Sequence, residues 1–185
     1  MISGLTYINN ILTPHSAQEL ITQIDKQSWR SDLKRRVQHY GYIYDYKRRT
    51  VDRDMYLGEL PNWSEPFINI LMTHKDFAIR PDQMIINEYE PGQGIAHHID
   101  CEPCFGDVIA SFSLNSTCIM SFIHAESNHE QELLLEPNSL LIMRGEARYN
   151  WKHGIPARKA DVYNGKRYTR ERRISITFRK VILNI

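Results

Sequence analysis

The sequence has 185 residues and lacks a long apolar run, an internal repeat and a low-complexity segment. A helix needs about 20 consecutive apolar residues to span a bilayer, so no membrane-spanning helix is predicted. The first residues, "MISGLTYINNIL", lack the charged n-region and small-residue cleavage site of a secretory signal peptide. The three cysteines cannot all pair within the chain. These absences favour a protein of the reducing cytoplasm.

The net charge of +1 hides a strong separation of charge along the chain. Residues 30–53 contain eight Lys and Arg and three acids, and residues 152–180 contain ten and two. The intervening residues 54–151 contain four Lys and Arg and fifteen acids. Two basic blocks predict one positive face on the folded protein. The alternative is that both blocks are ordinary solvated surface.

The order of short patterns predicts one domain over residues 1–185 that is mainly β (α+β). "TPHSAQELITQIDKQSW" predicts a helix that begins with a Ser16-x-x-Glu19 capping box, and "EPFINILMTHK" predicts a second helix. From residue 83 on, short apolar or alternating runs are separated by turn-forming residues, which is typical of a β-sandwich or barrel. We therefore expect helices and a polar hairpin in residues 1–82 and an all-β core in residues 83–185.

"AHHIDCEP", residues 96–103, places two histidines next to an aspartate. On a strand, residues two apart share a face, so His98 and Asp100 project together and His97 points the other way. A third ligand is needed, and the candidates are His124, His129 and His153. Two histidines and one carboxylate form the facial triad of non-haem Fe(II) oxygenases, which leaves coordination positions open for a co-substrate and dioxygen. The alternative for a lone His-x-Asp is a surface pair.

"RRISITFRK", residues 172–180, alternates polar and apolar side chains. A strand here would bury Ile174, Ile176 and Phe178 on one face. Its other face would present two guanidiniums and two hydroxyls, from Arg173, Ser175, Thr177 and Arg179. Because Arg binds carboxylates in a bidentate geometry, this face would suit a dicarboxylate. An ordinary half-exposed strand would show the same pattern.

Cys101-x-x-Cys104 directly follows the aspartate. A structural zinc site needs four ligands, and the sequence has no second cysteine pair. We therefore expect a buried or redox-silent pair of cysteines in preference to a zinc site.

Together, "NEYEPGQGIAHHID", "YNWKHGI" and "RRISITFRK" resemble the AlkB family of Fe(II)- and 2-oxoglutarate-dependent dioxygenases. Within that family, "RRVQHYGYIYDYKRRTVDRD" and "LLIMRGEARYNWKHGI" are most similar to the catalytic domain of the member that hydroxylates a modified wobble uridine in tRNA. The fold that the resemblance implies is a double-stranded β-helix, or jelly roll, with the N-terminal helices packed outside.

The resemblance also implies roles for individual residues. It implies that His98, Asp100 and His153 bind Fe(II), with 2-oxoglutarate and O2 as co-substrates. Asn87 and Tyr89 would hydrogen-bond 2-oxoglutarate. Arg173 would pair with its distal carboxylate and Arg179 would lie near the carboxylate bound to iron, with Ser175 and Thr177 in the same pocket.

The activity that the resemblance implies is hydroxylation or oxidative demethylation of a nucleic-acid base, with RNA, and tRNA in particular, favoured. Repair of alkylated DNA bases and oxidation of a protein substrate are the alternative reactions, and a non-catalytic RNA-binding module is the alternative from another class. The tRNA-acting family member carries an RNA-recognition module and a methyltransferase beside this domain. Since this sequence contains neither, we expect it to find RNA alone or with an accessory partner of one of these kinds.

"HYGYIYDYKRRTVDR" places four tyrosines at alternate positions, flanked by two clusters of cations. As a strand they would form one aromatic face for stacking bases, with cations that neutralise phosphates. In the AlkB family this region is a nucleotide-recognition lid. The residues expected to contact substrate are Arg35, Arg36, Tyr40, Tyr42, Lys47, Arg48 and Arg49. The alternative is that the tyrosines pack against the core, and we expect at least two of Tyr40, Tyr42, Tyr44 and Tyr46 to do so.

Overall fold

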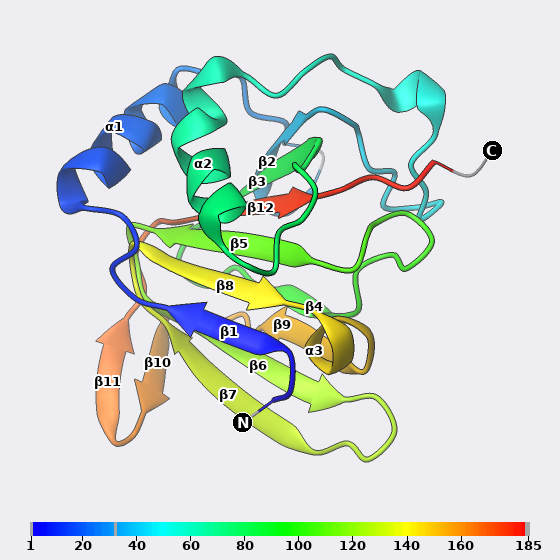
Figure 1. Cartoon of the computed structure of the whole chain (residues 1–185). Helices are drawn as coiled ribbons and strands as arrows, with labels where there is room; N and C mark the ends of the chain where they lie inside the picture. The colour runs from blue at the N-terminus through cyan, green and yellow to red at the C-terminus, as the bar shows by residue number, and fades with distance from the viewer. Residues whose placement is uncertain (1, 32, 184–185) are drawn as a thin grey trace.

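The computed structural model describes residues 2–31 and 33–183, which form two antiparallel sheets with helices over the larger one (Figure 1). The larger sheet has the strand order β1-β8-β5-β12-β3-β2, the smaller sheet has β4-β9-β6-β7, and β10–β11 is a separate hairpin. The strands are β1 (Leu5–Ile8), β2 (Arg36–Tyr40), β3 (Gln83–Tyr89), β4 (Ile95–His98), β5 (Ile109–Leu114), β6 (Cys118–His124), β7 (Glu130–Leu135), β8 (Ser139–Met143), β9 (Trp151–Ile155), β10 (Ala160–Tyr163), β11 (Lys166–Thr169) and β12 (Arg173–Arg179). The helices are α1 (Pro14–Asp25), α2 (Glu65–Thr73) and the short α3 (Gly145–Tyr149), with single 3-10 turns at Arg53–Met55 and Asn62–Ser64.

Strand β12 lies inside the larger sheet, between β5 and β3. Its three apolar side chains, Ile174, Ile176 and Phe178, are fully buried in the core on the helix side of the sheet. Its polar side chains therefore point to the other face, toward the smaller sheet, where Ser175, Thr177 and Arg179 line a cavity. The alternation predicted for residues 172–180 is confirmed.

Aromatic packing under helix α2 fixes the position of this strand. The ring centroid of Phe67 lies 4.8 Å from that of Phe112 on β5 and 6.0 Å from that of Phe178 on β12. All three side chains are fully buried. Truncating one such ring to Ala costs about 3–5 kcal/mol, so this cluster holds the central strands firmly against the helix.

Helix α1 begins three residues earlier than it would with Ser16 as its N-cap. Thr13 is the N-cap, its hydroxyl accepts a hydrogen bond from the Ser16 backbone N–H at 3.1 Å, and Pro14 occupies the first helical position. The predicted capping box of Ser16 and Glu19 is therefore wrong. Proline at this position explains the shift, because its fixed φ suits a first helical turn and its missing N–H needs no partner there.

The N-terminal segment contributes more to the sheet than the sequence patterns indicate. Both helices predicted for residues 1–82 are present, but β1 pairs with β8 and β2 pairs with β3 in the larger sheet. Residues 1–82 and 83–185 thus share one sheet. Within the described residues, no helix is long and apolar enough to cross a membrane.

Candidate active site

The three side chains expected to bind Fe(II), those of His98, Asp100 and His153, lie together between the two sheets. His98 at the end of β4 is in register with His153 on β9, and their ring centroids are 4.4 Å apart. Asp100 follows β4 in a loop, and its Oδ1 lies 3.7 Å from His98 Nε2. One ligand atom from each of the three residues lies within 4.8 Å of the other two. This donor set and spacing fit a two-histidine, one-carboxylate Fe(II) site.

The hydrogen bonding of His98 orients its ring for metal binding. Its Nδ1 lies 2.8 Å from the Ala96 carbonyl oxygen, which can only accept a hydrogen bond, so Nδ1 carries the proton. Nε2 is the nitrogen that faces Asp100. A hydrogen bond from the distal ring nitrogen is the usual way in which proteins orient a metal-binding imidazole.

The other histidines of the sequence lie outside this group. His97 points away from it, with Nε2 2.7 Å from Ser121 Oγ. His124 and His129 instead contact the Trp151 ring, with centroids 5.2 and 5.9 Å away. Of the three candidates for the third ligand, the structure brings only His153 to His98 and Asp100.

Electrostatics keep Asp100 and His153 in their metal-binding forms. Burial alone would raise the pKa of Asp100, but the Arg179 guanidinium and the two imidazoles outweigh it and hold that pKa well below its usual range. Two Arg179 nitrogens lie 3.1 and 3.2 Å from the Asp100 carboxylate oxygens. Burial, helped by the neighbouring His98, lowers the pKa of His153 to about 3. The carboxylate is therefore charged and the His153 imidazole neutral near pH 7.

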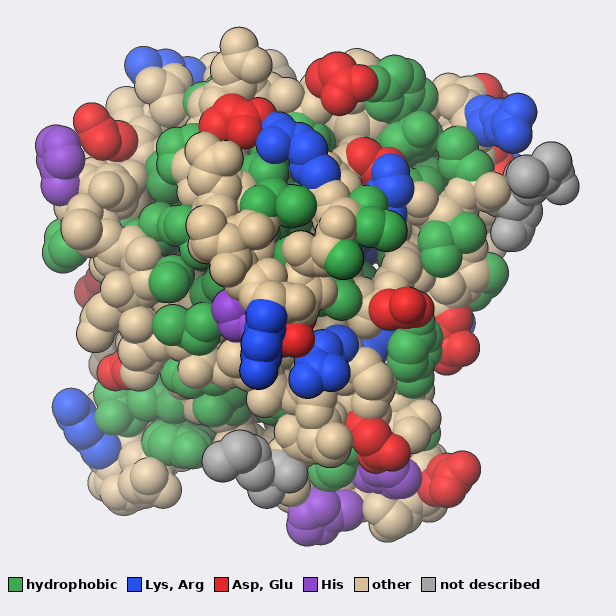
Figure 2. Space-filling view, viewed as in Figure 1, with side chains coloured by type: hydrophobic (Ala, Val, Ile, Leu, Met, Phe, Trp, Pro, Cys, Tyr) green, Lys and Arg blue, Asp and Glu red, His purple; other side chains and the backbone are tan. Residues whose placement is uncertain are grey.

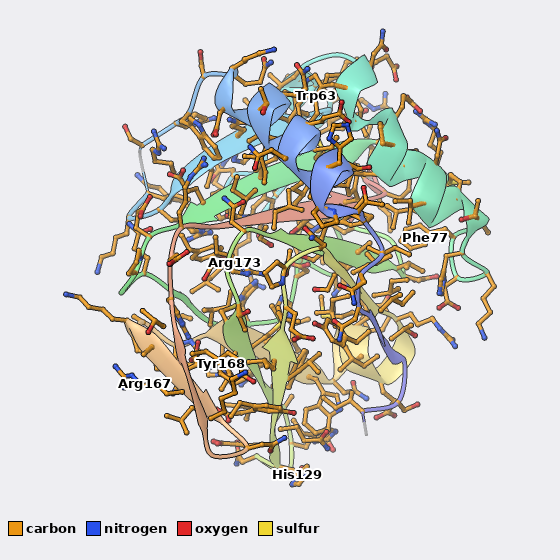
Figure 3. All side chains as sticks on the ribbon, turned by 90° about the vertical axis from the view of Figure 1, so that its left-hand side faces the viewer. Trp63, Phe77, His129, Arg167, Tyr168 and Arg173 are labelled. Carbon is orange, nitrogen blue, oxygen red and sulfur yellow. A yellow bond between two sulfur atoms is a disulfide. The ribbon has the colours of Figure 1, made fainter. Side chains whose placement is uncertain are left out.

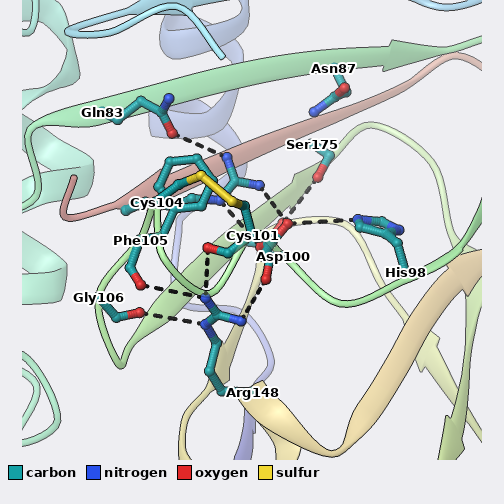
Figure 4. Close-up of polar contacts among 12 residues, drawn as sticks. Gln83, Asn87, His98, Asp100, Cys101, Cys104, Phe105, Gly106, Arg148 and Ser175 are labelled. Atoms are coloured by element: carbon teal, nitrogen blue, oxygen red, sulfur yellow. Dashed lines mark hydrogen bonds and ion pairs between the residues drawn. A yellow bond between two sulfur atoms is a disulfide. The ribbon is translucent and has the colours of Figure 1, made fainter. Parts of the chain in front are cut away.

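A buried arginine that the sequence patterns missed holds the loop after Asp100. Arg148, 2% exposed, donates hydrogen bonds to the carbonyl oxygens of Asp100 at 2.9 Å, Cys101 at 3.3 Å and Gly106 at 3.4 Å (Figure 4). Arg148 comes from the short helix α3, where "RGEARYN" shows no periodicity that separates it from a surface arginine. Its partners are main-chain atoms 42 to 48 residues away, which no local pattern encodes.

Arg173 has unused hydrogen-bonding capacity inside the protein. It is 2% exposed, and its Nη2 donates to Ser113 Oγ at 2.7 Å. Its Nε and Nη1 are buried and have no partner in the described part of the chain. Buried donors are almost always satisfied, so two unpartnered nitrogens on one guanidinium fit the binding of a carboxylate. Ser113, on the neighbouring β5, is a partner that the sequence analysis did not find.

A cavity of about 830 Å³ joins the candidate metal ligands to the residues expected to bind 2-oxoglutarate. Its lining includes Asn87, Tyr89, Ser175, Thr177 and Arg179. Arg173 is in register with Tyr89 on β3 and lies behind it, with its guanidinium carbon 5.6 Å from the tyrosine ring centroid. Asn87 Oδ1 accepts a hydrogen bond from Arg35 Nε at 2.8 Å, which ties the cavity wall to the segment before β2.

The four alternating tyrosines do not form one strand face, and that structural expectation is wrong. The strand ends at Tyr40, because Gly41 adopts a φ of +76° and approaches the Asp82 carbonyl so closely that a Cβ would lie 1.8 Å from its oxygen. Tyr40 packs on Trp63 on the helix side, whereas Tyr42 and Tyr44 pack against the core between the sheets. The expectation that at least two tyrosines pack against the core is confirmed.

The residues expected to contact substrate fall into three groups: some line the cavity, some are exposed, and some point elsewhere. Arg35 and Arg49 line the cavity, together with Tyr44 and Tyr46, which were not among the expected contacts. Lys47 and Arg48 are exposed, and Arg48 pairs with Asp45 and Asp52. Three of the expected contacts point elsewhere. Arg36 pairs with Glu88 and covers Trp29, Tyr40 is on Trp63, and Tyr42 is on Tyr56.

Cys101 and Cys104 form a disulfide, and each residue is 4% exposed. The expected buried pair is confirmed, and disulfide sulfurs are not the thiolates that zinc needs. The two sulfur atoms lie 3.2 and 3.4 Å from the Arg49 carbonyl oxygen. The disulfide belongs to the loop that follows Asp100, and it contacts the segment that carries Lys47, Arg48 and Arg49.

Comparisons with known proteins agree with this site. Residues 4–179 match the family described as the 2OG-Fe(II) oxygenase superfamily. A mouse protein named alpha-ketoglutarate-dependent dioxygenase alkB homolog 7, mitochondrial, is 30% identical over 87% of this chain and 75% of its own length. An Arabidopsis thaliana protein named alkylated DNA repair protein ALKBH8 homolog is 37% identical over 97% of this chain and 59% of its own length.

A further relative is much longer than this chain. A Macaca fascicularis protein named tRNA (carboxymethyluridine(34)-5-O)-methyltransferase ALKBH8 is 39% identical, over 85% of this chain and 25% of its own length. Among solved structures, that of OsALKBH1 superposes with a TM-score of 0.71 at 20% identity, covering 96% of each chain. That likeness concerns the fold, and with the family match it confirms the predicted jelly roll with helices outside. The chain therefore belongs to the AlkB family of 2OG-Fe(II) oxygenases, dioxygenases that use Fe(II), 2-oxoglutarate and O2.

Proposed function

We propose that this dioxygenase hydroxylates or oxidatively demethylates a base in RNA, with tRNA as the favoured substrate. The observation that carries the proposal is the lining of the cavity, which includes Tyr44 and Tyr46 together with the cations Lys34, Arg35, Arg49 and Lys152; we call these six residues the rim. Aromatic rings stack on unpaired bases and cations neutralise phosphates, so this rim suits a single-stranded nucleotide better than a neutral peptide. The name of the macaque relative supports tRNA in particular.

The residues of the chain divide the work between the metal and the co-substrate. His98, Asp100 and His153 would hold Fe(II), and Asn87, Tyr89, Arg173, Ser175, Thr177 and Arg179 would hold 2-oxoglutarate. When bound, the metal and 2-oxoglutarate activate dioxygen to oxidise a substrate C–H bond, with succinate and carbon dioxide as by-products. Arg179 keeps Asp100 charged through its two short contacts. Arg173 has two free N–H groups with which to orient a distal carboxylate.

The cavity wall favours oxidation over side reactions. Ile109, Met120, Leu141 and Met143 form apolar lining around the polar groups. Apolar walls limit the water that reaches a reactive centre, and the rim must place one C–H bond beside the metal. An N-methyl group oxidised in this way loses formaldehyde, whereas a carbon substituent keeps its hydroxyl group.

The test compares substrate classes with one readout. The purified protein, supplied with Fe(II) and 2-oxoglutarate, is incubated with tRNA, with single-stranded DNA carrying methylated bases, and with peptides. Succinate release is measured, and nucleosides are identified by mass spectrometry. We expect tRNA to raise succinate release most and to yield an oxidised or demethylated nucleoside. Faster turnover with methylated DNA would favour DNA repair, and turnover with peptides alone would refute a nucleic-acid substrate.

A charge variant tests the exposed basic segment of residues 47–49, which includes the rim residue Arg49. Lys47 and Arg49 are exposed without an ion pair among the described residues, whereas Arg48 is already paired. Each lost contact with a single-stranded phosphate flattens the slope of log affinity against log salt by about 0.7, so Lys47→Gln with Arg49→Gln should flatten it by up to about 1.4. The control, Lys26→Gln with Lys75→Gln, removes the same charge from exposed positions just beyond α1 and α2 and should leave the slope unchanged.

A further inference from the structure

The hairpin β10–β11 is a rigid projection at the margin of the molecule (Figures 1 and 3). Its tight turn uses Asn164 and Gly165, with φ values of 50° and 77°. At its base, the fully buried Asp161 carboxylate accepts hydrogen bonds from Arg170 at 2.6 and 2.8 Å and from Arg158 at 2.6 Å. Asp161 also accepts from the Ile119 N–H of the smaller sheet at 3.2 Å. These bonds fix the hairpin to the sheet that carries His153.

Most of the second basic block is engaged within the protein. Of the ten cations in residues 152–180, Arg158, Arg170, Arg172, Arg179 and Lys180 form ion pairs and Arg173 is buried. The predicted single positive face is therefore much reduced, and Figure 2 shows acidic and basic side chains interspersed on the face it displays. Four exposed cations have no ion pair within the described chain: Lys152, Lys159, Lys166 and Arg167. Three of these four belong to the hairpin or the residue just before it.

Contacts connect Lys159 to the rim of the cavity. Lys159 packs over Gly92, and the Lys159 Cγ lies 3.8 Å from the position that a Cβ on Gly92 would occupy. The Gly92 N–H donates a hydrogen bond to the Arg158 carbonyl oxygen at 3.2 Å. In the same turn, Gln93 Nε2 donates to the Lys34 carbonyl at 2.7 Å. Lys34 itself lines the cavity. The turn at residues 91–94 thus joins Lys34 on one side to the hairpin on the other.

We propose that Lys159, Lys166 and Arg167 form a second docking surface for the phosphate backbone of the polynucleotide whose base enters the cavity. The inference rests on the proposed nucleic-acid substrate and adds where the rest of that polymer binds. Cations held on a rigid support lose little entropy when they bind, and each neutralised phosphate releases counterions. Arg167 and Lys166 alternate along β11, so they lie on opposite faces of the hairpin and can contact phosphates on both sides of its tip. Lys166 Nζ also lies 5.0 Å from the Tyr168 ring centroid, which restrains it.

The experiment compares Lys166→Gln with Arg167→Gln against the control pair Lys26→Gln with Lys75→Gln. All four side chains are exposed and both variants lose two positive charges. RNA affinity is measured across salt concentrations, and KM is measured for full-length RNA and for a trinucleotide that fills only the cavity. We expect the hairpin variant to flatten the salt slope by up to about 1.4 and to raise KM for full-length RNA at least fivefold. KM for the trinucleotide should rise by less than twofold, and the control should match the wild type in every measurement.

Each other outcome identifies which proposal fails. If RNA binds with a strong salt dependence that both double variants leave unchanged, the hairpin is not a docking surface although the substrate is nucleic acid. Equal increases of KM for the trinucleotide and the long RNA would also overturn it, because the hairpin would then act through the cavity. If the wild-type protein shows no salt-dependent RNA affinity, both proposals fall. A single Lys159→Gln variant repeats the test on the residue nearest the cavity and should flatten the slope by about 0.7.

Discussion

Replacing Arg148 should weaken metal binding, although Arg148 is not itself a candidate ligand. Arg148 is 2% exposed, and its guanidinium donates to four main-chain carbonyls of the loop that begins at Asp100. In Arg148→Met all four carbonyls lose a charged donor. A hydrogen bond to a charged group contributes about 1.5–3 kcal/mol, and some of these bonds are long, so we expect a loss of about 3–5 kcal/mol. For a domain of this size, that lowers Tm by roughly 6–20 °C.

The effect on the metal follows from the position of Asp100. Its carbonyl is held by Arg148 and its carboxylate by Arg179, so the residue is fixed at both ends. Without Arg148 the backbone can move, and a ligand that spends less time in place binds metal more weakly. We expect the dissociation constant for Mn(II), measured anaerobically by calorimetry well below Tm, to rise at least tenfold. Arg148→Lys should recover part of this loss because it restores one donor.

The control is Arg80→Met, which removes an exposed arginine paired with Glu65 at the surface. Surface pairs contribute about 0–1 kcal/mol, so stability and metal affinity should stay near the wild-type values. If Arg148→Met lowers Tm but leaves the Mn(II) dissociation constant unchanged, Arg148 supports the fold without positioning Asp100. If neither quantity changes, the hydrogen-bond reasoning is wrong.

Three further predictions concern single groups. His98→Ala should abolish Mn(II) binding, whereas His97→Ala loses only a contact with Ser121 and should retain Mn(II) binding. Equal losses of Mn(II) affinity in titrations of the two variants would contradict the geometry. Arg173→Met should raise KM for 2-oxoglutarate by a hundredfold or more and leave Mn(II) affinity unchanged, because breaking a buried ion pair costs about 3–5 kcal/mol. An unaltered KM would show that Arg173 does not bind the distal carboxylate of 2-oxoglutarate. Burial would raise the pKa of Asp161, but its bonds to Arg170 and Arg158 outweigh burial and hold that pKa below its usual range. The stability that Asp161 contributes is therefore present near pH 7 and is lost as pH falls through the lowered pKa. Asp161→Asn should therefore unfold about 3–5 kcal/mol more easily at pH 7 and lose less stability on acidification, and urea titrations at pH 7 and pH 3 that show parallel losses in both proteins would refute this.

Local patterns predicted those parts of the site that lie on regular strands. The period of two placed Ser175, Thr177 and Arg179 on the cavity side of β12, because one face of that strand must bury Ile174, Ile176 and Phe178. The same rule separated His98 from His97, although Asp100 itself lies just beyond the strand. A strict side-chain period needs no knowledge of the rest of the fold.

Features that depend on distant segments could not be predicted in this way. The alternating tyrosines match a strand pattern, but the close approach of Gly41 to the Asp82 carbonyl ends the strand after Tyr40. Ser113 and Arg148 reach the site from 60 and 42–48 residues away, through contacts that exist only after the sheets have packed. The charge blocks were misleading for a related reason, since ion pairs such as Arg170–Asp161 and Arg179–Asp100 form within the fold.

The placement of Arg173 and Arg179 on an interior strand has a consequence for how such enzymes diversify. β12 is hydrogen-bonded on both edges and packed on its apolar face, so a substitution there disturbs both neighbouring strands as well as the co-substrate. The turn after Tyr40 and the β10–β11 hairpin carry no co-substrate residue and are joined to the body at a few points. Mutations can accumulate in these two segments and redirect the enzyme to new polymers while the oxidation chemistry stays intact. For laboratory evolution of altered substrate choice, randomised libraries belong at the exposed positions of residues 41–50 and 159–169, with Gly41, Asp161 and β12 left untouched.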